Sequence, residues 1–210
     1  MKAVLISIRP KRCELIASGK QTIEVQKSRP KIATPFKCYI YCTNSKFDVN
    51  ACLRNNLHYD DSTLAVNAGN GKVIGEFVCD TVEVLFDTNG NPENYMTDIL
   101  PSILQQTALS YDDFARYVGS RADKTSIFGW HISDLKIYNT PKELSKFEVA
   151  DKRAIRQCKY REQTYYAFTD TGYIKNGFYC KQKDDWCFSG CKRKALKRPP
   201  QSWMYVEELQ

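Results

Sequence analysis

Short runs of apolar, aromatic and β-branched residues recur along the chain, and polar or glycine-containing segments separate each run from the next. Runs of this length and composition predict β-strands. The predicted strands are Ala3 to Ile8, Thr22 to Gln26, Phe36 to Cys42, Lys72 to Phe86, Ile127 to Tyr138 and Trp203 to Val206. Gly75 interrupts the longest run, which indicates a bulge or a bend of the kind that curls a sheet.

The run from Thr22 to Gln26 (TIEVQ) alternates between polar and apolar residues. Ile23 and Val25 fall on one face of the predicted strand, whereas Glu24 and Gln26 fall on the other. We therefore expect the first face to contribute to the core and the second face to be available for chemistry.

Two short helices accompany these strands. Pro10 opens the first helix, where its missing N–H costs little, and the pair Ser18-Gly19 ends it. Ser110 caps a second helix, SYDDFARYVG, which ends at Gly119. Strands that dominate over two helices, without repeated βα units, predict an α+β fold whose sheet curls into a barrel.

The composition indicates which class of partner the protein binds. The 210 residues include 31 Lys and Arg against 24 Asp and Glu, and the resulting formal charge of +7 favours an anionic partner such as nucleic acid.

No apolar run reaches the roughly 18 residues that a membrane-spanning helix needs, and no export signal follows Met1. Nine cysteines in such a chain indicate the reducing cytoplasm. The missing Walker A, G-x-S-x-G, H-E-x-x-H and dinucleotide glycine patterns argue against nucleotide hydrolysis and redox chemistry.

The segment SIRPKRCELIASGKQTIEVQKSRP resembles the opening of the ASCH domain (activating signal cointegrator homology), a member of the PUA-like β-barrels. That family carries a pattern close to G-x-K-x-x-E-x-R, and its four positions fall here on Gly19, Gln21, Glu24 and Gln26. KVIGEFVCDTVEV resembles the family's central strand, and IFGWHISDLKIY and RPPQSWMYVEEL resemble the closing strands of bacterial and phage-like members. The resemblance implies one PUA-like domain over residues 1–210, with a Cys- and Lys-rich insertion at about 150–197 and a closing strand at 198–210.

The chain departs from this pattern at two positions, because the lysine is Gln21 and the arginine is Gln26. A related bacterial enzyme of the superfamily hydrolyses N4-acetylcytidine with a lysine, a threonine and a glutamate. In this register its lysine falls on Gln21 and its threonine on Glu24. Glutamine serves neither as a base nor as a charged electrophile, so the resemblance implies this hydrolysis only if Lys20 takes over and forms an acid–base pair with Glu24.

Basic, polar and aromatic residues form a candidate nucleic-acid interface. Lysine and arginine would contact phosphates, Glu24 and Gln26 would contact a base edge, and Trp130 would stack on an unpaired base. The candidates are Arg9, Lys11, Arg12, Lys20, Glu24, Gln26, Lys27, Trp130, Arg198 and Trp203. The alternatives are an ordinary solvated face for the cations, a salt bridge from Glu24 to Lys20 or Lys27, and a core position for Trp130.

Four cysteines lie late in the chain, at Cys158, Cys180, Cys187 and Cys191. Four thiolates in a tetrahedral array would bind a structural zinc ion and stabilise a segment too small to fold by burial alone. Their spacing lacks the paired C-x2-C units of a typical zinc site, so free thiols are the alternative. No other cofactor is expected.

The leading interpretation is a nucleic-acid-binding ASCH-like protein that holds RNA or a modified nucleotide in a basic cleft. One alternative is a hydrolase on the same cleft, acting on N4-acetylcytidine or as a ribonuclease. Another is a phage or mobile-element factor that binds a host protein through the basic insertion. RNA is the first expected partner, and no membrane partner is expected.

Overall fold

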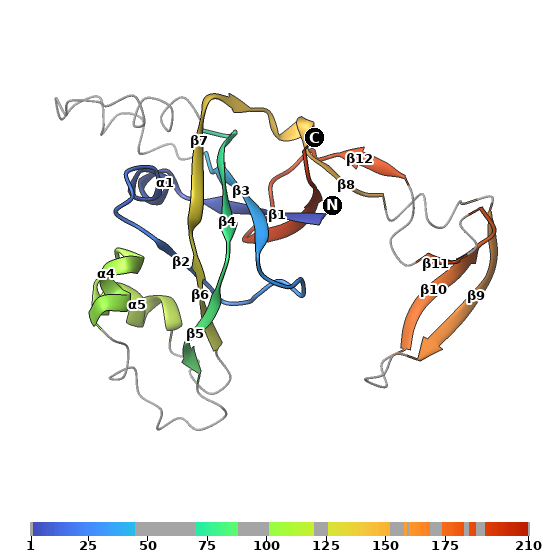
Figure 1. Cartoon of the computed structure of the whole chain (residues 1–210), viewed down its shortest axis with the longest axis horizontal. Coiled ribbons are helices and arrows are strands. Elements are labelled where there is room, and N and C mark those ends of the chain that lie inside the picture. The colour runs from blue at the N-terminus through green and yellow to red at the C-terminus, as the bar shows by residue number, and fades with distance from the viewer. Residues whose placement is uncertain are drawn as a thin grey trace.

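The computed structural model describes residues 2–44, 70–87, 101–119, 126–151, 158, 160–168, 174–182, 185–187 and 192–209. Residues 161–168, 174–179 and 185–187 are described by their backbone only. No helix among the described residues is long and apolar enough to cross a membrane. The described part is α+β, with short helices beside the β-sheets, as the sequence predicts (Figure 1).

A five-stranded sheet forms the centre of the molecule. Its order is β13 (Trp203–Glu207), β1 (Lys2–Ile8), β3 (Phe36–Cys42), β4 (Val73–Cys79) and β7 (Ser133–Lys142). β1 runs parallel to β3, and the other neighbours are antiparallel. Both faces of β1 are covered: Val4 and Ile6 belong to one core cluster, and Ala3 and Leu5 belong to another. Burial on both faces explains why this strand is a continuous apolar run rather than an alternating one.

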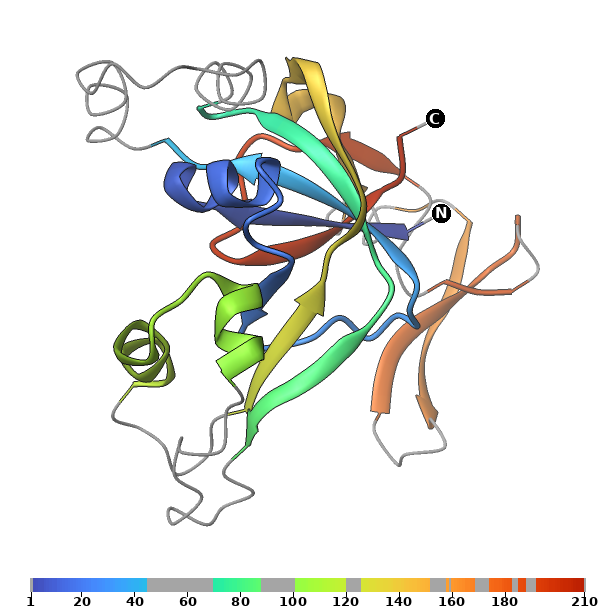
Figure 2. The same cartoon turned by 60° about the vertical axis from the view of Figure 1, so that its left-hand side comes forward.

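A second sheet has the order β2 (Ile23–Gln26), β6 (Ser126–His131) and β5 (Val82–Asp87). Only Ile132 separates β6 from β7, and two residues separate β4 from β5. Each of the two long predicted strands is therefore two strands with a bend between them, and the two sheets follow one another along this bent pair (Figure 2). A curled barrel stays a prediction, because the described pairings form separate sheets.

Gly75 lies where the pairing of β4 with both of its neighbours shifts register. A Cβ atom added at this position would lie 2.5 Å from the backbone oxygen of Lys136. The predicted irregularity is therefore present, and the close approach of β7 explains why a residue without a side chain occupies it.

The two predicted helices are confirmed as α1 (Pro10–Ala17) and α5 (Tyr111–Val118). Pro10 occupies the start of α1, and Gly19 follows its end with φ at 70°. Ser110 Oγ accepts the backbone N–H of Asp113 at the start of α5. A further helix, α4 (Pro101–Thr107), and the one-turn 3-10 helix η3 (Leu144–Lys146) were not predicted.

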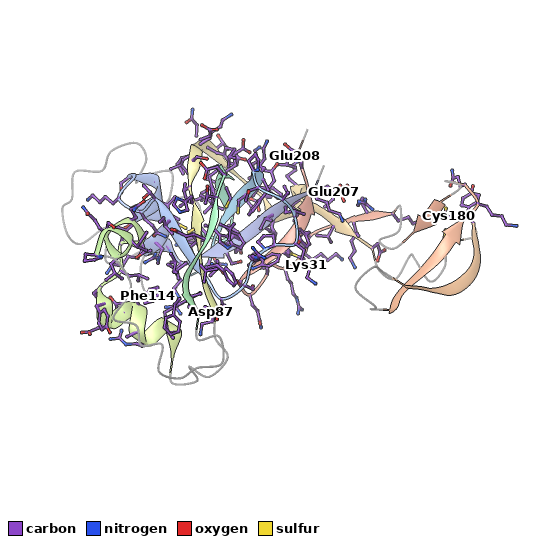
Figure 3. All side chains as sticks on the ribbon, turned by 60° about the horizontal axis from the view of Figure 1, so that its bottom comes forward. Lys31, Asp87, Phe114, Cys180, Glu207 and Glu208 are labelled. Carbon is purple, nitrogen blue, oxygen red and sulfur yellow. The ribbon has the colours of Figure 1, made fainter. Side chains whose placement is uncertain are left out.

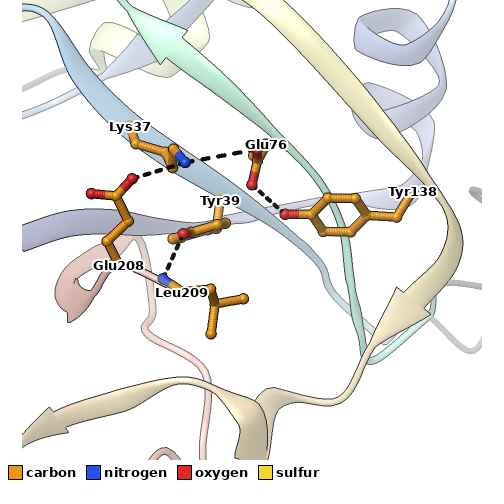
Figure 4. Close-up of polar contacts among 6 residues, drawn as sticks. All are labelled: Lys37, Tyr39, Glu76, Tyr138, Glu208 and Leu209. Atoms are coloured by element: carbon orange, nitrogen blue, oxygen red, sulfur yellow. Dashed lines mark hydrogen bonds and ion pairs between the residues drawn. The ribbon is translucent and has the colours of Figure 1, made fainter.

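The segment after β13 contacts side chains of β3 in the central sheet, as Figure 4 shows. The Lys37 ammonium lies 2.9 Å from a Glu208 carboxylate oxygen, and the Leu209 N–H donates to the Tyr39 hydroxyl oxygen over 2.9 Å. The hydroxyl of Tyr138 donates to the Glu76 carboxylate. The first two contacts hold residues 208 and 209 beside β3, and the third joins β7 to β4.

The late part of the chain contains short strands. β8 (Glu148–Ala150) pairs with β12 (Arg193–Ala195). β9 (Arg161–Phe168), β10 (Ile174–Cys180) and β11 (Asp185–Cys187) form an antiparallel sheet that lies apart from the central sheet in Figures 1 and 2. This sheet falls within the region predicted as an insertion.

Candidate functional site

A pocket of about 370 Å³ opens where the end of β1, the start of α1, β2 and the segment before β13 meet. Four of the predicted site residues line it, namely Arg9, Arg12, Glu24 and Gln26. Helix α5 forms another wall with Tyr117, and Phe114 and Val118 on the same helix pack in a core cluster with Val25 and Ile127. The short helix–turn–strand at the start of the chain thus provides one side of a concave site.

Glu24 is the buried charged residue of this pocket, with an exposed fraction of 7%. Its side chain was expected on an open face of β2, but all four residues of this strand are buried. Burial raises the pKa of the Glu24 carboxyl, and the nearby Arg12 guanidinium and two amide hydrogen bonds oppose that rise. A carboxylate in this position is therefore held by specific partners rather than by solvent.

Those partners are Gln21 and Gln26, which stand where the pattern that the sequence resembles has lysine and arginine. Gln21 Nε2 donates to Glu24 Oε2 over 2.6 Å, and Gln26 Nε2 donates to Glu24 Oε1 over 3.0 Å. Gln21 Nε2 also donates to the Ile23 carbonyl oxygen over 3.1 Å. Because both neighbours of this Gln21 atom are acceptors, it must be the nitrogen of the amide. Two N–H groups directed at the two oxygens form the pattern that suits an ionised carboxylate.

The hydroxyl groups of the pocket donate to protein acceptors. Ser202 Oγ donates to Gln26 Oε1 over 2.7 Å, and Ser7 Oγ donates to the Pro200 carbonyl oxygen over 2.7 Å. Tyr117 Oη donates to the Val25 carbonyl oxygen over 3.1 Å, and burial raises the pKa of Tyr117 to about 12. Each of these hydroxyl hydrogens is thus used in a bond to the protein, and each hydroxyl oxygen can still accept a hydrogen bond from a ligand.

Two arginines supply the positive charge of the pocket. Arg9 is exposed and joins in no ion pair within the described part of the chain. Arg12 is partly buried and donates from Nη2 to the Thr107 carbonyl oxygen over 2.7 Å. This bond ties α1 to the end of α4 and fixes the Arg12 guanidinium beside the pocket, where its remaining N–H groups can bind an anion.

The other predicted cations lie on the surface outside the pocket lining. Lys11, Lys20, Lys27 and Arg198 are exposed. The Lys27 ammonium lies 5.1 Å from the centre of the Tyr117 ring, which places it over a pocket residue. Trp203 is partly buried and donates from Nε1 to Ser28 Oγ over 3.0 Å. Lys27 therefore contacts a side chain that lines the pocket.

Trp130 requires a correction, because its side chain has an exposed fraction of 0%. Its ring packs 5.7 Å from the Phe36 ring and 5.7 Å from the Trp203 ring, between centroids. A base has no face of this residue to stack on, so Trp130 belongs to the core. The alternative of a salt bridge from Glu24 to Lys20 or Lys27 is also wrong, since the carboxylate is bound by two glutamines and both lysines are exposed.

The zinc prediction lies partly outside the described residues. Cys158 and Cys180 are free cysteines that pack together with Tyr160, and Cys180 is labelled on the outlying sheet in Figure 3. The Cys187 side chain and the whole of Cys191 are outside the described part. Among the residues that are described, no group of three or more His, Cys, Asp or Glu could hold a metal ion. The four-cysteine site stays a prediction.

Sequence reasoning missed the apolar residues that line the pocket, and it also missed the hydroxyl groups of Ser7 and Tyr117. A serine inside the apolar run AVLISI was a signal for Ser7, because a polar residue in a strand buried on both faces needs a hydrogen-bond partner. Tyr117 gave no such signal in its helix. Ser202 lies between Arg198 and Trp203 in a segment whose polar and aromatic residues suit nucleotide contact, but no local pattern predicts its bond to Gln26.

Comparison with known proteins points to ASCH structures. No protein-family model matches the chain, and no curated protein matches its sequence. The crystal structure of ASCH from Zymomonas mobilis shares 19% identity with a TM-score of 0.42, covering 68% of this chain and 73% of that one. A serine-to-alanine mutant of the same protein shares 14% identity with a TM-score of 0.48, covering 98% of this chain and 89% of that one. The chain is thus similar to solved ASCH structures, the family that its sequence resembles.

Proposed function

We propose that the protein binds a nucleotide unit of RNA, with the base in the pocket and the phosphate at its mouth. The observation that best supports this proposal is the buried Glu24 carboxylate. It lies between Gln21 and Gln26 in a pocket that two arginines also line. A buried carboxylate accepts hydrogen bonds from a base edge, whereas arginine binds phosphate. This combination of one buried acceptor and two cations matches a nucleotide better than it matches a simple anion.

The concave shape of the site supports single-stranded nucleic acid over a duplex, and RNA is the single strand that we propose. The base recognition residues are buried side chains in a concave pocket, and an unpaired base that leaves its stack can enter such a pocket. A paired base inside a duplex cannot present its Watson–Crick edge to Glu24. Lys27, which lies over the Tyr117 ring, and the exposed Lys11 and Lys20 extend the positive surface for the neighbouring phosphates.

Binding to fluorescent single-stranded RNA, duplex RNA and duplex DNA at two salt concentrations tests the proposal. We expect single-stranded RNA to bind most tightly, with an affinity that falls as salt rises. Arg9→Ala and Arg12→Ala should each reduce the salt dependence by about 0.7 in the log–log slope, the value for one phosphate contact on a single strand. Lys146→Ala removes an exposed cation of η3, outside the pocket, and is the matched control. Equal losses in all three variants, or no binding at all, would refute the proposed site.

A hydrolase on the same pocket is the second candidate, and the raised pKa of Glu24 favours it. A carboxyl whose pKa is raised by burial is better placed to act as a general base or acid near neutral pH. The exposed Lys20 is not paired with Glu24, so this candidate depends on Glu24 and an attacking water rather than on the pair expected from the sequence. Incubation with N4-acetylcytidine and with RNA, followed by chromatography of the products, tests it, and Glu24→Gln should abolish any turnover.

A further inference from the structure

The three hydroxyl groups that line the pocket act as hydrogen-bond acceptors toward a ligand. Ser7, Tyr117 and Ser202 each line it, and each hydroxyl hydrogen is given to a protein acceptor. The Gln26 amide likewise directs its nitrogen at Glu24 and its oxygen at Ser202. What the three hydroxyl groups offer a ligand is therefore lone pairs. The donors of the pocket are the guanidinium groups of Arg9 and Arg12, the second Nε2 hydrogen of Gln26 and the amide of Gln201.

Glu24 contributes most of this acceptor capacity. An ionised carboxylate has about four lone-pair sites on its two oxygens. Each oxygen of Glu24 accepts one hydrogen bond from a glutamine, which leaves further sites on both Oε1 and Oε2. Two adjacent acceptors of the same charged group suit a ligand that presents two adjacent donors in one plane.

We propose that the pocket selects guanine, and this inference rests on the proposed nucleotide-binding function. Among the common bases, guanine alone has two neighbouring donors, N1–H and the N2 amino group, on its Watson–Crick edge. Adenine and cytosine each present a donor beside a ring-nitrogen acceptor, and uracil presents one donor between two carbonyl oxygens. These acceptors would face the Glu24 lone pairs and would leave buried polar groups unpaired, which is the strongest source of discrimination between similar ligands.

The walls of the pocket fit a planar base with its phosphate outward. Ile8, Val25 and Leu109 provide apolar surface, and the Tyr117 ring is held in place by its hydroxyl bond to Val25 and by Lys27 above it. Arg12 is fixed by its bond to Thr107 and keeps further N–H groups for a phosphate. The guanine edge would therefore meet Glu24 while the 5′-phosphate meets the arginines.

Calorimetric titration of the intact chain with five nucleoside 5′-monophosphates tests the selectivity. The probes are GMP, IMP, AMP, CMP and UMP at one pH and one salt concentration. We expect GMP to bind at least about ten-fold more tightly than AMP, CMP or UMP. IMP lacks only the N2 amino group, and the loss of that one hydrogen bond to a charged acceptor should weaken binding by about ten-fold relative to GMP.

Two variants test whether Glu24 causes the preference for GMP. Glu24→Gln preserves the size of the side chain but replaces one acceptor oxygen by a donor, so it should remove the preference for GMP over AMP. Glu148→Gln changes an exposed glutamate of β8 and should leave the preference unchanged. Circular dichroism of both variants shows whether they are folded. If Glu24→Gln does not fold, the affinities of the unaltered protein for the five nucleotides still test guanine selection.

The outcomes distinguish this inference from the function on which it rests. Equal affinity for all five nucleotides overturns guanine selection but leaves nucleotide binding intact, and so does a preference for AMP, CMP or UMP. Equal affinity for GMP and IMP overturns the proposed role of the N2 amino group. The lack of binding of every mononucleotide overturns guanine selection, and the RNA titration described above then decides whether RNA binding survives.

Discussion

The Ser202 hydroxyl donates to Gln26 Oε1 over 2.7 Å, although 176 positions separate the two residues in the chain. This bond orients the Gln26 amide so that its nitrogen faces Glu24. The segment before β13 thereby controls a residue of β2, and the polar part of the pocket depends on both ends of the described chain. The dependence can be measured.

Ser202→Ala should weaken nucleotide binding more than it weakens the fold. The loss of the hydroxyl frees the Gln26 amide to turn, and a single neutral hydrogen bond contributes about 0.5–1.5 kcal/mol, which corresponds to a few-fold to ten-fold loss of affinity. Titration with nucleotide or single-stranded RNA measures the change. Ser133→Ala removes a hydroxyl that donates to the Val78 carbonyl oxygen, away from the pocket, and should leave affinity unchanged. Equal effects of the two changes would contradict the role of Ser202.

Glu24 should make the stability of the protein depend on pH. Burial raises its pKa in the folded state above the ordinary value near 4.5. Between these two pKa values the folded state holds a proton that the unfolded state has released. The free energy of unfolding should therefore fall as pH rises through that window. Urea denaturation in steps from pH 4.5 upward measures this slope.

Glu24→Gln should flatten that pH dependence, because glutamine does not titrate. Glu148→Gln, at an exposed position of β8, is the matched control and should retain the slope of the unaltered protein. A slope that persists in Glu24→Gln would assign the proton uptake to another group.

Trp130 should behave as a core residue and not as a binding residue. Trp130→Ala removes a fully buried ring between Phe36 and Trp203, so the free energy of unfolding should drop by about 3–5 kcal/mol. Trp130→Phe should cost less and should bind RNA like the unaltered protein. A large loss of RNA affinity in a folded Trp130→Phe variant would restore the stacking hypothesis.

Gly75→Ala should destabilise the central sheet. The added methyl group would lie 2.5 Å from the Lys136 backbone oxygen, and overpacking of this kind costs about 1–3 kcal/mol. Gly19→Ala is a useful comparison, because nothing lies within 4 Å of the added atom and only the positive φ of 70° opposes it, at about 1–2 kcal/mol. Thermal or urea denaturation of both variants ranks them. A smaller loss for Gly75→Ala than for Gly19→Ala would show that β7 moves away easily.

The elements of the fold were largely predictable from local pattern. Pro10 and Gly19 bound α1, Ser110 and Gly119 bound α5, and the apolar runs correspond to strands. Helix α4 was missed because its seven residues span less than two full turns and offer too few apolar positions for a helical period. The breaks inside the two long runs were also missed, since a run of strand-forming residues does not show where a sheet bends.

The candidate site was predictable in its residue types but not in its contacts. Glu24, Arg9 and Arg12 were recognised, whereas the Ser202–Gln26 bond joins segments that no local pattern relates. Glutamine at the positions where the resembled pattern has lysine and arginine suggested a loss of chemistry. The structure shows instead that both amides contact the same carboxylate, since glutamine keeps the donor without the charge.

The position of β1 has a consequence for the newly synthesised chain. β1 pairs on one side with β3 and on the other with β13, whose residues follow about 200 positions later. Until residues 203–207 have been translated, the apolar strand from Ala3 to Ile6 has one open edge. An open, apolar edge is a template for pairing with other chains, so the protein passes through an interval in which self-association competes with folding. Chaperones that bind extended apolar segments would act on this strand during that interval.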